Sequence, residues 1–255
     1  MVGGGLTGIE SAAQIKGVYS SLQVTLVTDG ECGVFSKRKV QDYMRKSLIR
    51  QNILLHEHTR VKELTEHDIL LADDKAVPYD LCLWTSGFEG LPLAAEAGIA
   101  TNERGRILVD PYLRSVTYPE IYAVGDAAFP TEPTGAPPRM SVWFAQTTGA
   151  HAADNLSRLL RNKPQKPFGY STQGQCIALG PNNGVGFGNY PNDRPVGPII
   201  RGKFAVPQRA MVLNSLMFLF ELERRWPGSF VWPGKGRHAA IIPASNLKSK
   251  SQHTA

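Results

Sequence analysis

Apolar residues recur at helical spacing in four stretches of this chain. An apolar side chain returns every three or four positions within residues 3–20, 37–50, 141–161 and 208–226. That period matches one face of an α-helix, so each stretch is predicted to contain a helix. In the first stretch the periodic residues follow a run of glycines.

Shorter runs of apolar and β-branched residues separate the predicted helices and are typical of strands. The predicted strands cover residues 22–27, 53–55, 59–64, 69–71, 76–79, 80–85, 121–124, 175–180 and 184–190. The runs 69–71 and 76–79 flank a polar turn and are predicted to form a hairpin, whereas 22–27 and 80–85 are predicted to be buried strands. A glycine loop followed by a helix and a parallel-type strand predicts an α/β unit.

Three glycines open the chain with the spacing Gly3-x-Gly5-x-x-Gly8. In a dinucleotide-binding unit the first glycine permits a tight turn, the second admits the pyrophosphate, and the third lets helix and strand pack closely. The free N–H groups and the positive dipole end of the following helix then face the phosphates. The spacing predicts a phosphate loop, and a glycine-rich turn without a ligand is the alternative.

The strand after this helix ends in Val27-Thr28-Asp29, where the pattern expects an acid for the adenosine ribose hydroxyls. Asp29 is the candidate acid. If Thr28 holds the acid position instead, the choice between NADH and NADPH is open. The basic triplet 37–39 would then be available to a 2′-phosphate, although such a triplet is also typical of a solvated helix start.

A second nucleotide signal lies far from the first. Residues 121–128 read IYAVGDAA, a short apolar run that ends in Gly125-Asp126 and small residues. The glycine would let a cofactor come close, and the carboxylate would accept hydrogen bonds from a polyol hydroxyl. Together with the glycine loop, this motif indicates a second cofactor in the same protein.

With these motifs the sequence resembles the FAD- and NAD(P)-dependent flavoproteins of the pyridine nucleotide-disulfide oxidoreductase superfamily. Its closest likeness is to bacterial type II NADH dehydrogenase-like enzymes. The resemblance rests on the glycine loop, a crossover at Thr85-Ser86-Gly87, the stretch RILVDPYLRSVTYPEIYAVGDAA and the helix RMSVWFAQTTGAHAADNL. It implies that Gly87, Gly125 and Asp126 line the cofactor sites, with Asp126 on the ribitol of FAD. It also implies that Gln146 and Thr147 contact the isoalloxazine.

The resemblance also implies a division of the chain. Residues 1–86 would form a Rossmann-type NAD(P)-binding domain with an incomplete first strand, and residues 87–163 the second half of an FAD-binding domain. A small α+β region would follow at 164–236, and a disordered tail at 237–255. Relatives begin with their own FAD-binding βαβ unit, which does not precede Gly3 here, so we expect an N-terminally truncated flavoprotein.

The activity implied is hydride transfer from NAD(P)H to FAD, followed by electron delivery to an acceptor, with a quinone as the leading candidate. Such chemistry needs no catalytic side chain or metal, and none stands out in the sequence. By resemblance, Glu10 orients the nicotinamide; the alternative is an exposed helix acid. His151 is expected to be a surface residue. A soluble ferredoxin- or dye-type reductase and a non-catalytic nucleotide-binding remnant stay open as alternatives.

Composition narrows this picture only slightly. The 255 residues carry a formal net charge of +6, but no zinc-finger spacing or aromatic RNA-binding motif accompanies the basic residues, so no nucleic-acid partner is expected. The cysteines Cys32, Cys82 and Cys176 form no redox pair, which disfavours a disulfide reductase.

No secretory leader opens the chain and no apolar run could span a bilayer, so a cytoplasmic protein is expected. The helix at 208–226 combines an apolar block with arginines and tryptophan. It is expected either to lie peripherally on the inner membrane face or to pack in a core or a homodimer interface.

Overall fold

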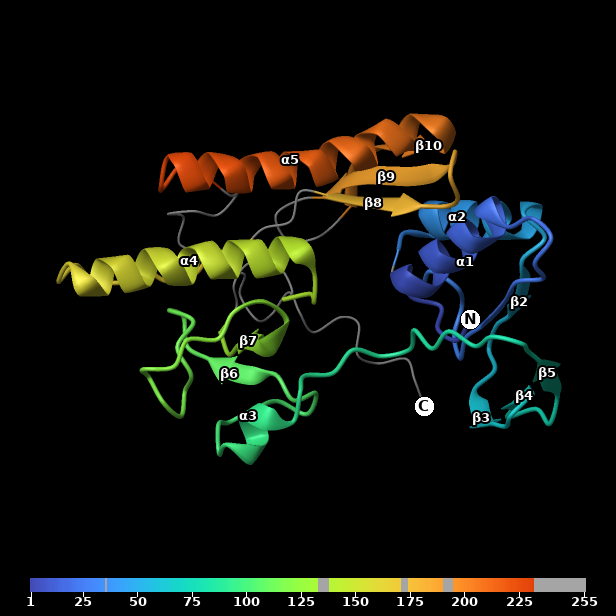
Figure 1. The fold of residues 1–255 in the computed structure, drawn as a ribbon, viewed down its shortest axis with the longest axis horizontal. Helices are drawn as coiled ribbons and strands as arrows, with labels where there is room; N and C mark the ends of the chain where they lie inside the picture. Colours follow the sequence, from blue (N-terminus) through green and yellow to red (C-terminus); the bar gives the residue numbers. More distant parts are fainter. Residues whose placement is uncertain (35, 133–137, 171–173, 190–194, 232–255) are drawn as a thin grey trace. The chain divides into compact units, whose positions relative to one another are not determined.

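The computed structural model describes residues 1–34, 36–132, 138–170, 174–189 and 195–231 (Figure 1). The predicted tail at 237–255 lies outside these residues. The chain divides into two compact units. The first contains Met1–Gly87, Gly174–Gly188 and Pro195–Phe218, and the second contains the described residues of Phe88–Gln173, Asn189–Arg194 and Leu219–Ala255.

The first unit is built on a parallel sheet. Its elements are α1 (Leu6–Val18), β1 (Thr25–Val27), α2 (Arg38–Arg50) and β2 (Leu54–His56). β1 pairs in parallel with β2, and Val2 forms parallel bridges to both Val27 and Trp84. The order β2–β1–Val2–Trp84 is the strand order 3-2-1-4 of one half of a dinucleotide-binding sheet.

The core of the first unit forms where helices cover this sheet. Ile9, Ala12 and Ala13 of α1 and Val40, Met44 and Leu48 of α2 are fully buried, together with Leu26 of β1. These positions are three or four residues apart on each helix, so the apolar period read from the sequence is the face that packs. The predicted helices in 3–20 and 37–50 are confirmed.

A three-stranded antiparallel sheet adjoins this core. It consists of β3 (Val61–Leu64), β4 (Asp68–Leu71) and β5 (Ala76–Pro78), in that order. Ile69 pairs with Val77 across the predicted hairpin, which is confirmed. Val2, Val27, Ile69, Leu71 and Val77 form one buried cluster, so the small sheet packs against the parallel one.

The late strands also belong to the first unit. β8 (Gly174–Ala178), β9 (Gly184–Asn189) and β10 (Pro195–Arg201) form a sheet in the order β10–β9–β8. A 3-10 turn (Gly202–Phe204) leads into α5 (Ala205–Arg225). Ile177 and Val185 complete the core of α1 and α2. The strands predicted at 175–180 and 184–190 are thus confirmed, and β10 was not predicted.

The second unit has less regular structure. It contains α3 (Leu93–Glu96), β6 (Ile107–Val109), a 3-10 turn (Gly125–Ala127), β7 (Ala128–Pro130) and α4 (Val142–Leu160), and β6 pairs in parallel with β7. Its core gathers around Phe144, whose ring meets Phe168 and Tyr170 edge-on. α4 begins at Ser141, whose hydroxyl accepts the Phe144 N–H at 3.2 Å and caps the helix.

Two predicted strands are wrong. Within the described part of the chain, residues 80–85 make a single β-bridge, at Trp84, and Leu81 and Trp84 are 77% and 54% exposed, so this segment is not the predicted buried strand. Two backbone hydrogen bonds join this segment to Val2: the Val2 N–H donates to the Leu83 carbonyl, and the Thr85 N–H donates to the Val2 carbonyl. Residues 121–124 bridge only through Tyr122, because their partner, the segment around Arg114, is a loop rather than a strand.

Of the helices in the described part of the chain, none combines the length and the apolar character needed to span a bilayer.

Candidate functional site

The glycine loop at the head of α1 is shaped by backbone contacts. Gly3 has φ +120°, a conformation that other residues rarely adopt. A Cβ on Gly8 would lie 1.9 Å from the Gly3 carbonyl oxygen, so the helix can approach the loop only with glycine there. A Cβ on Gly5 would meet nothing within 4 Å, and no side chain caps the helix at Gly5. The loop is therefore closely packed at Gly3 and Gly8 and open at Gly5, as a phosphate loop requires.

The end of β1 shows how Asp29, the candidate acid, and Thr28, which could occupy the acid's position, differ in their surroundings. Thr28 is buried, and its hydroxyl would lie 2.5 Å from a Cβ on Gly4, so its side chain packs against the glycine loop. Asp29 is exposed, and within the described residues no hydrogen bond or ion pair holds its carboxylate. The carboxylate oxygens of Asp29 are therefore accessible to a ligand, whereas the buried Thr28 side chain is not.

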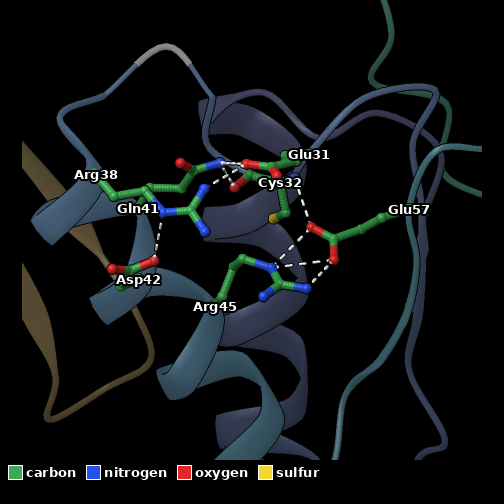
Figure 2. A network of polar contacts seen from close by, with 7 residues as sticks. All are labelled: Glu31, Cys32, Arg38, Gln41, Asp42, Arg45 and Glu57. Carbon is green, nitrogen blue, oxygen red and sulfur yellow. Dashed lines mark hydrogen bonds and ion pairs between the residues drawn. The ribbon is translucent and has the colours of Figure 1, made fainter.

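A polar network joins the loop after β1 to α2 and to Glu57 (Figure 2). Glu57, just after β2, accepts the Cys32 N–H at 2.7 Å and the Arg45 Nε–H at 2.9 Å. Burial opposes ionisation of Glu57, but these hydrogen bonds outweigh burial and lower its pKa. Burial, reinforced by Glu57, raises the pKa of the Cys32 thiol to about 12, so this thiol is not a nucleophile. The pair Arg45–Glu57 ties α2 to the carboxyl edge of the sheet.

The lowered pKa of Glu57 predicts an acid-sensitive fold. A carboxyl with a lower pKa in the folded than in the unfolded chain adds stability above its unfolded pKa of about 4.3, and the contribution disappears as pH falls through the folded value. We expect Glu57→Gln to lower stability at pH 7 and to flatten its decline between about pH 5 and 3. Urea unfolding across this range measures both effects. Exposed Glu66 provides the isosteric control Glu66→Gln, and equal slopes for Glu57→Gln and the unchanged protein would contradict the assignment.

Glu10 on α1 is half-buried rather than an exposed helix acid. Its Oε1 accepts the Ala178 N–H of β8 at 2.7 Å and lies 3.8 Å from Nε of Arg209 on α5. The carboxylate therefore joins α1 to the late strands. Orientation of a nicotinamide by Glu10 stays a prediction.

In the second unit, the Gly125-Asp126 turn is held by α4. Gly125 has φ +61°, and a Cβ there would lie 3.2 Å from Cβ of Ala145. Its N–H donates to the Thr148 hydroxyl at 2.8 Å, and that hydroxyl donates to the Phe144 carbonyl at 2.7 Å. Thr148 is a positioning residue that the sequence did not reveal, because a threonine inside a helix carries no sign of its distant partner.

Arg106, the residue before β6, supports the same turn. It is only 5% exposed and donates to the carbonyls of Asp126 at 3.0 Å, Pro138 at 3.0 Å and Ala128. Its guanidinium lies over the Phe129 ring, 5.4 Å from the centroid. Burial lowers the pKa of Arg106, with the Asp126 carboxylate acting in the opposite direction. The exposed Asp126 side chain thus projects from a turn whose backbone is fixed on two sides.

The two predicted flavin contacts on α4 differ in their surroundings. Gln146 is 9% exposed, and among the residues that the structure describes neither its Nε2 nor its Oε1 has a hydrogen-bond partner. A buried amide without partners is costly, so this side chain fits a polar ligand that would satisfy it. Thr147 is fully buried, and its hydroxyl is hydrogen-bonded to the carbonyls of Trp143 and Phe144 in its own helix. Its hydroxyl is therefore already satisfied.

The surface prediction for His151 is wrong. His151 is 7% exposed, and its Nε2 lies 2.9 Å from the Lys166 carbonyl oxygen and 3.2 Å from Nδ2 of Asn155. Because α4 packs this face against residues 166–170, the helix spacing alone did not distinguish His151 from a solvated position.

The predicted site residues fall into two groups. The first unit contains Gly3, Gly5, Gly8, Glu10, Asp29 and Gly87. Gly87 has φ +84°, and a Cβ there would meet nothing within 4 Å. The others, Gly125, Asp126, Gln146 and Thr147, belong to the second unit. Across the described ranges, no group of His, Cys, Asp and Glu side chains could hold a metal ion.

Comparison with known proteins supports the resemblance described in the sequence analysis. Residues 1–153 match the family described as pyridine nucleotide-disulphide oxidoreductase. The type II NADH:quinone oxidoreductase of Haemophilus influenzae is 26% identical over 228 residues, which cover 80% of this chain and 49% of that protein. A probable NADH dehydrogenase of Dictyostelium discoideum is 26% identical over 201 residues, covering 72% of this chain and 44% of that protein. The chain spans about half the length of these curated relatives.

Solved structures agree on the fold. NDH2 of Plasmodium falciparum in complex with NADH superposes with a TM-score of 0.70 at 16% identity, covering 89% of this chain and 65% of that one. The sulfide:quinone oxidoreductase of Aquifex aeolicus gives a TM-score of 0.62 at 17% identity, with coverages of 82% and 53%. At these identities the likeness concerns the mixed α/β fold alone.

Proposed function

The chain belongs to the pyridine nucleotide-disulphide oxidoreductase family, and on this premise we propose that it oxidises NAD(P)H with FAD and passes the electrons to a quinone. The observation that carries the proposal is that one chain holds two nucleotide-type features. One is the glycine loop that is open at Gly5, and the other is the rigid turn from which Asp126 projects.

The nicotinamide dinucleotide would lie at the head of α1. Its pyrophosphate would meet the backbone N–H groups after Gly5, where no side chain intrudes. Asp29 would accept hydrogen bonds from the adenosine ribose, and Gly87 would leave room for the ligand at the crossover. Glu10 would orient the nicotinamide through the carboxylate oxygen that Ala178 does not use.

The flavin would be held by the second unit. Asp126 would bind the ribitol hydroxyls, and Gln146 would gain the partners that its buried amide lacks. Thr147 is the other proposed isoalloxazine contact, and Gly125 would allow the close approach of the cofactor. When bound, FAD accepts electrons from the nicotinamide and delivers them to the acceptor, while the protein supplies alignment and exclusion of water.

A quinone acceptor is supported by a relative and by one helix. The Haemophilus influenzae relative is a type II NADH:quinone oxidoreductase. α5 exposes a series of large apolar side chains and ends in Arg224 and Arg225. The exposed apolar residues are Met211, Val212, Met217, Phe218 and Phe220. Such a helix is suited to the interface of an anionic membrane, next to the apolar layer that holds lipid-soluble quinones.

Membrane contact through α5 predicts retention on vesicles. We expect the protein to float with anionic phospholipid vesicles and to lose this property in the variant Met217→Glu/Phe218→Glu, which places charges on the exposed apolar side. A protein that stays at the bottom of the gradient would favour a core or homodimer role for the helix.

Steady-state assays test the proposed function directly. Purified protein is incubated with FAD, separated from free flavin and supplied with NADH or NADPH plus a soluble ubiquinone analogue, ferredoxin or a dye. We expect flavin absorbance near ~450 nm and turnover that is fastest with the quinone. Turnover with ferredoxin or dye alone would favour a soluble reductase. A colourless protein that binds NADH without turnover would favour a nucleotide-binding remnant.

The role of Thr148 can be separated from that of its neighbour. Thr148→Val removes the acceptor of the buried Gly125 N–H, so we expect FAD affinity to fall about tenfold. Thr147→Val is the same isosteric change one residue earlier, where the hydroxyl bonds only to its own helix. Flavin fluorescence titration measures both variants. If Thr147→Val weakens FAD binding more than Thr148→Val does, the direct contact at Thr147 outweighs the support of Gly125.

A further inference from the structure

The loop that follows β1 borders the glycine loop. The Gly33 N–H donates to the Gly4 carbonyl at 3.1 Å, and the His58 N–H donates to the Gly30 carbonyl at 3.3 Å. The loop thereby joins the carboxyl edge of the parallel sheet, where an adenosine ribose binds in this type of fold. Its acidic residues, Asp29 and Glu31, are therefore close to the part of the ligand that distinguishes NADH from NADPH.

Arg38, at the start of α2, is engaged by carboxylates on both sides (Figure 2). Its NH1 lies 2.9 Å from Oε2 of Glu31, and its Nε lies 3.2 Å from Oδ1 of Asp42. Gln41 donates to the same Glu31 oxygen at 2.8 Å and to the Cys32 carbonyl at 3.2 Å, which fixes Glu31 relative to the loop. Two nitrogens of the exposed Arg38 guanidinium, NH1 and Nε, thus face carboxylates of the protein.

This arrangement decides what the basic triplet 37–39 can do. Of these three residues, only the arginine has a planar guanidinium that can bind a phosphate with two hydrogen bonds at once. Lys37 and Lys39 are exposed and carry point charges. A 2′-phosphate bound by Arg38 would lie beside the carboxylates of Glu31 and Asp42, which would repel it. The neutral hydroxyls of NADH donate hydrogen bonds to a carboxylate and incur no such repulsion.

We propose that the Glu31–Arg38–Asp42 cluster makes this protein select NADH over NADPH. The proposal rests on the function proposed above and specifies the nucleotide of that same site. Asp29 binds the ribose hydroxyls, and Glu31 and Asp42 are the specificity-determining residues that keep Arg38 away from a phosphate.

Calorimetric titration of the purified protein with NADH and with NADPH tests the proposal. We expect NADH to bind at least about tenfold more tightly at 0.15 M salt. The double variant Glu31→Gln/Asp42→Asn keeps the shape of both side chains but frees Arg38 from charge pairing, so NADPH should bind at least about fivefold more tightly than it does to the unchanged protein. Glu221→Gln is the matched control, because Glu221 pairs with Arg224 and Arg225 on exposed α5.

The outcomes separate this inference from the function on which it rests. Equal binding of the two nucleotides by the unchanged protein overturns the inference and leaves the function intact. A double variant with an unchanged affinity ratio overturns it as well. NADH-selective binding without turnover supports the inference and contradicts the proposed activity, whereas binding of neither nucleotide overturns both.

Discussion

Gly8→Ala is expected to destabilise the first unit by about 3 kcal/mol and to abolish nucleotide binding. The new Cβ would lie 1.9 Å from the Gly3 carbonyl oxygen and 2.9 Å from the Thr85 hydroxyl. The nearer atom is backbone and cannot rotate away, so α1 would have to move from the loop that it packs against. Urea unfolding and titration with NADH measure the two losses.

Gly5→Ala is the control that separates stability from binding. A Cβ at Gly5 meets nothing within 4 Å, and its φ of −75° suits alanine, so stability should stay within about 0.5 kcal/mol. The same methyl group would occupy the space through which the pyrophosphate approaches, so NADH affinity should fall. A Gly8→Ala protein that is as stable as the parent would refute the close packing described here. Unchanged affinity in Gly5→Ala would refute the phosphate loop.

Arg106→Ala is expected to cost about 3 kcal/mol, because it removes charged hydrogen bonds to three carbonyls and leaves a cavity beside Phe129. The turn that carries Asp126 would lose its hydrogen bond from Arg106, so FAD affinity should fall together with stability. Thermal unfolding and flavin titration measure the two effects.

Arg104 provides the matched control for this variant. It lies two residues away on the same segment, its side chain is exposed, and within the described residues no hydrogen bond or ion pair engages it. Arg104→Ala removes the same charge and should leave both measurements unchanged. Equal effects of the two substitutions would mean that charge alone, and not the three carbonyl contacts, explains the result.

The periodic elements were predictable because their signals are local. The helix α2 and the hairpin β4–β5 follow from side-chain spacing and turn residues, which neighbouring positions in the chain decide. The Gly3-x-Gly5-x-x-Gly8 spacing predicted both the tight turn and the close approach of α1. In each of these cases the residues that interact are a few positions apart.

The errors have the opposite origin. An apolar run such as 80–85 is typical of a buried strand, but whether it forms a ladder depends on the length of its partner, which here is Val2. The burial of His151 depends on residues 166–170, and the connection of Glu10 to Ala178 spans most of the chain. None of these partners can be identified from the spacing around the residue itself.

The amino-acid sequence by itself determined the α/β class, the tight glycine turn before α1 and the Gly125-Asp126 motif, because backbone sterics and side-chain period act over short distances. Only the tertiary structure decided that the Thr28 side chain is buried against the glycine loop while Asp29 is exposed, that Thr148 and Arg106 hold the Gly125-Asp126 turn, and that Arg38 is engaged by Glu31 and Asp42. Those outcomes depend on which polar groups meet across the fold, and hydrogen bonds and ion pairs form only between groups that folding has already brought together.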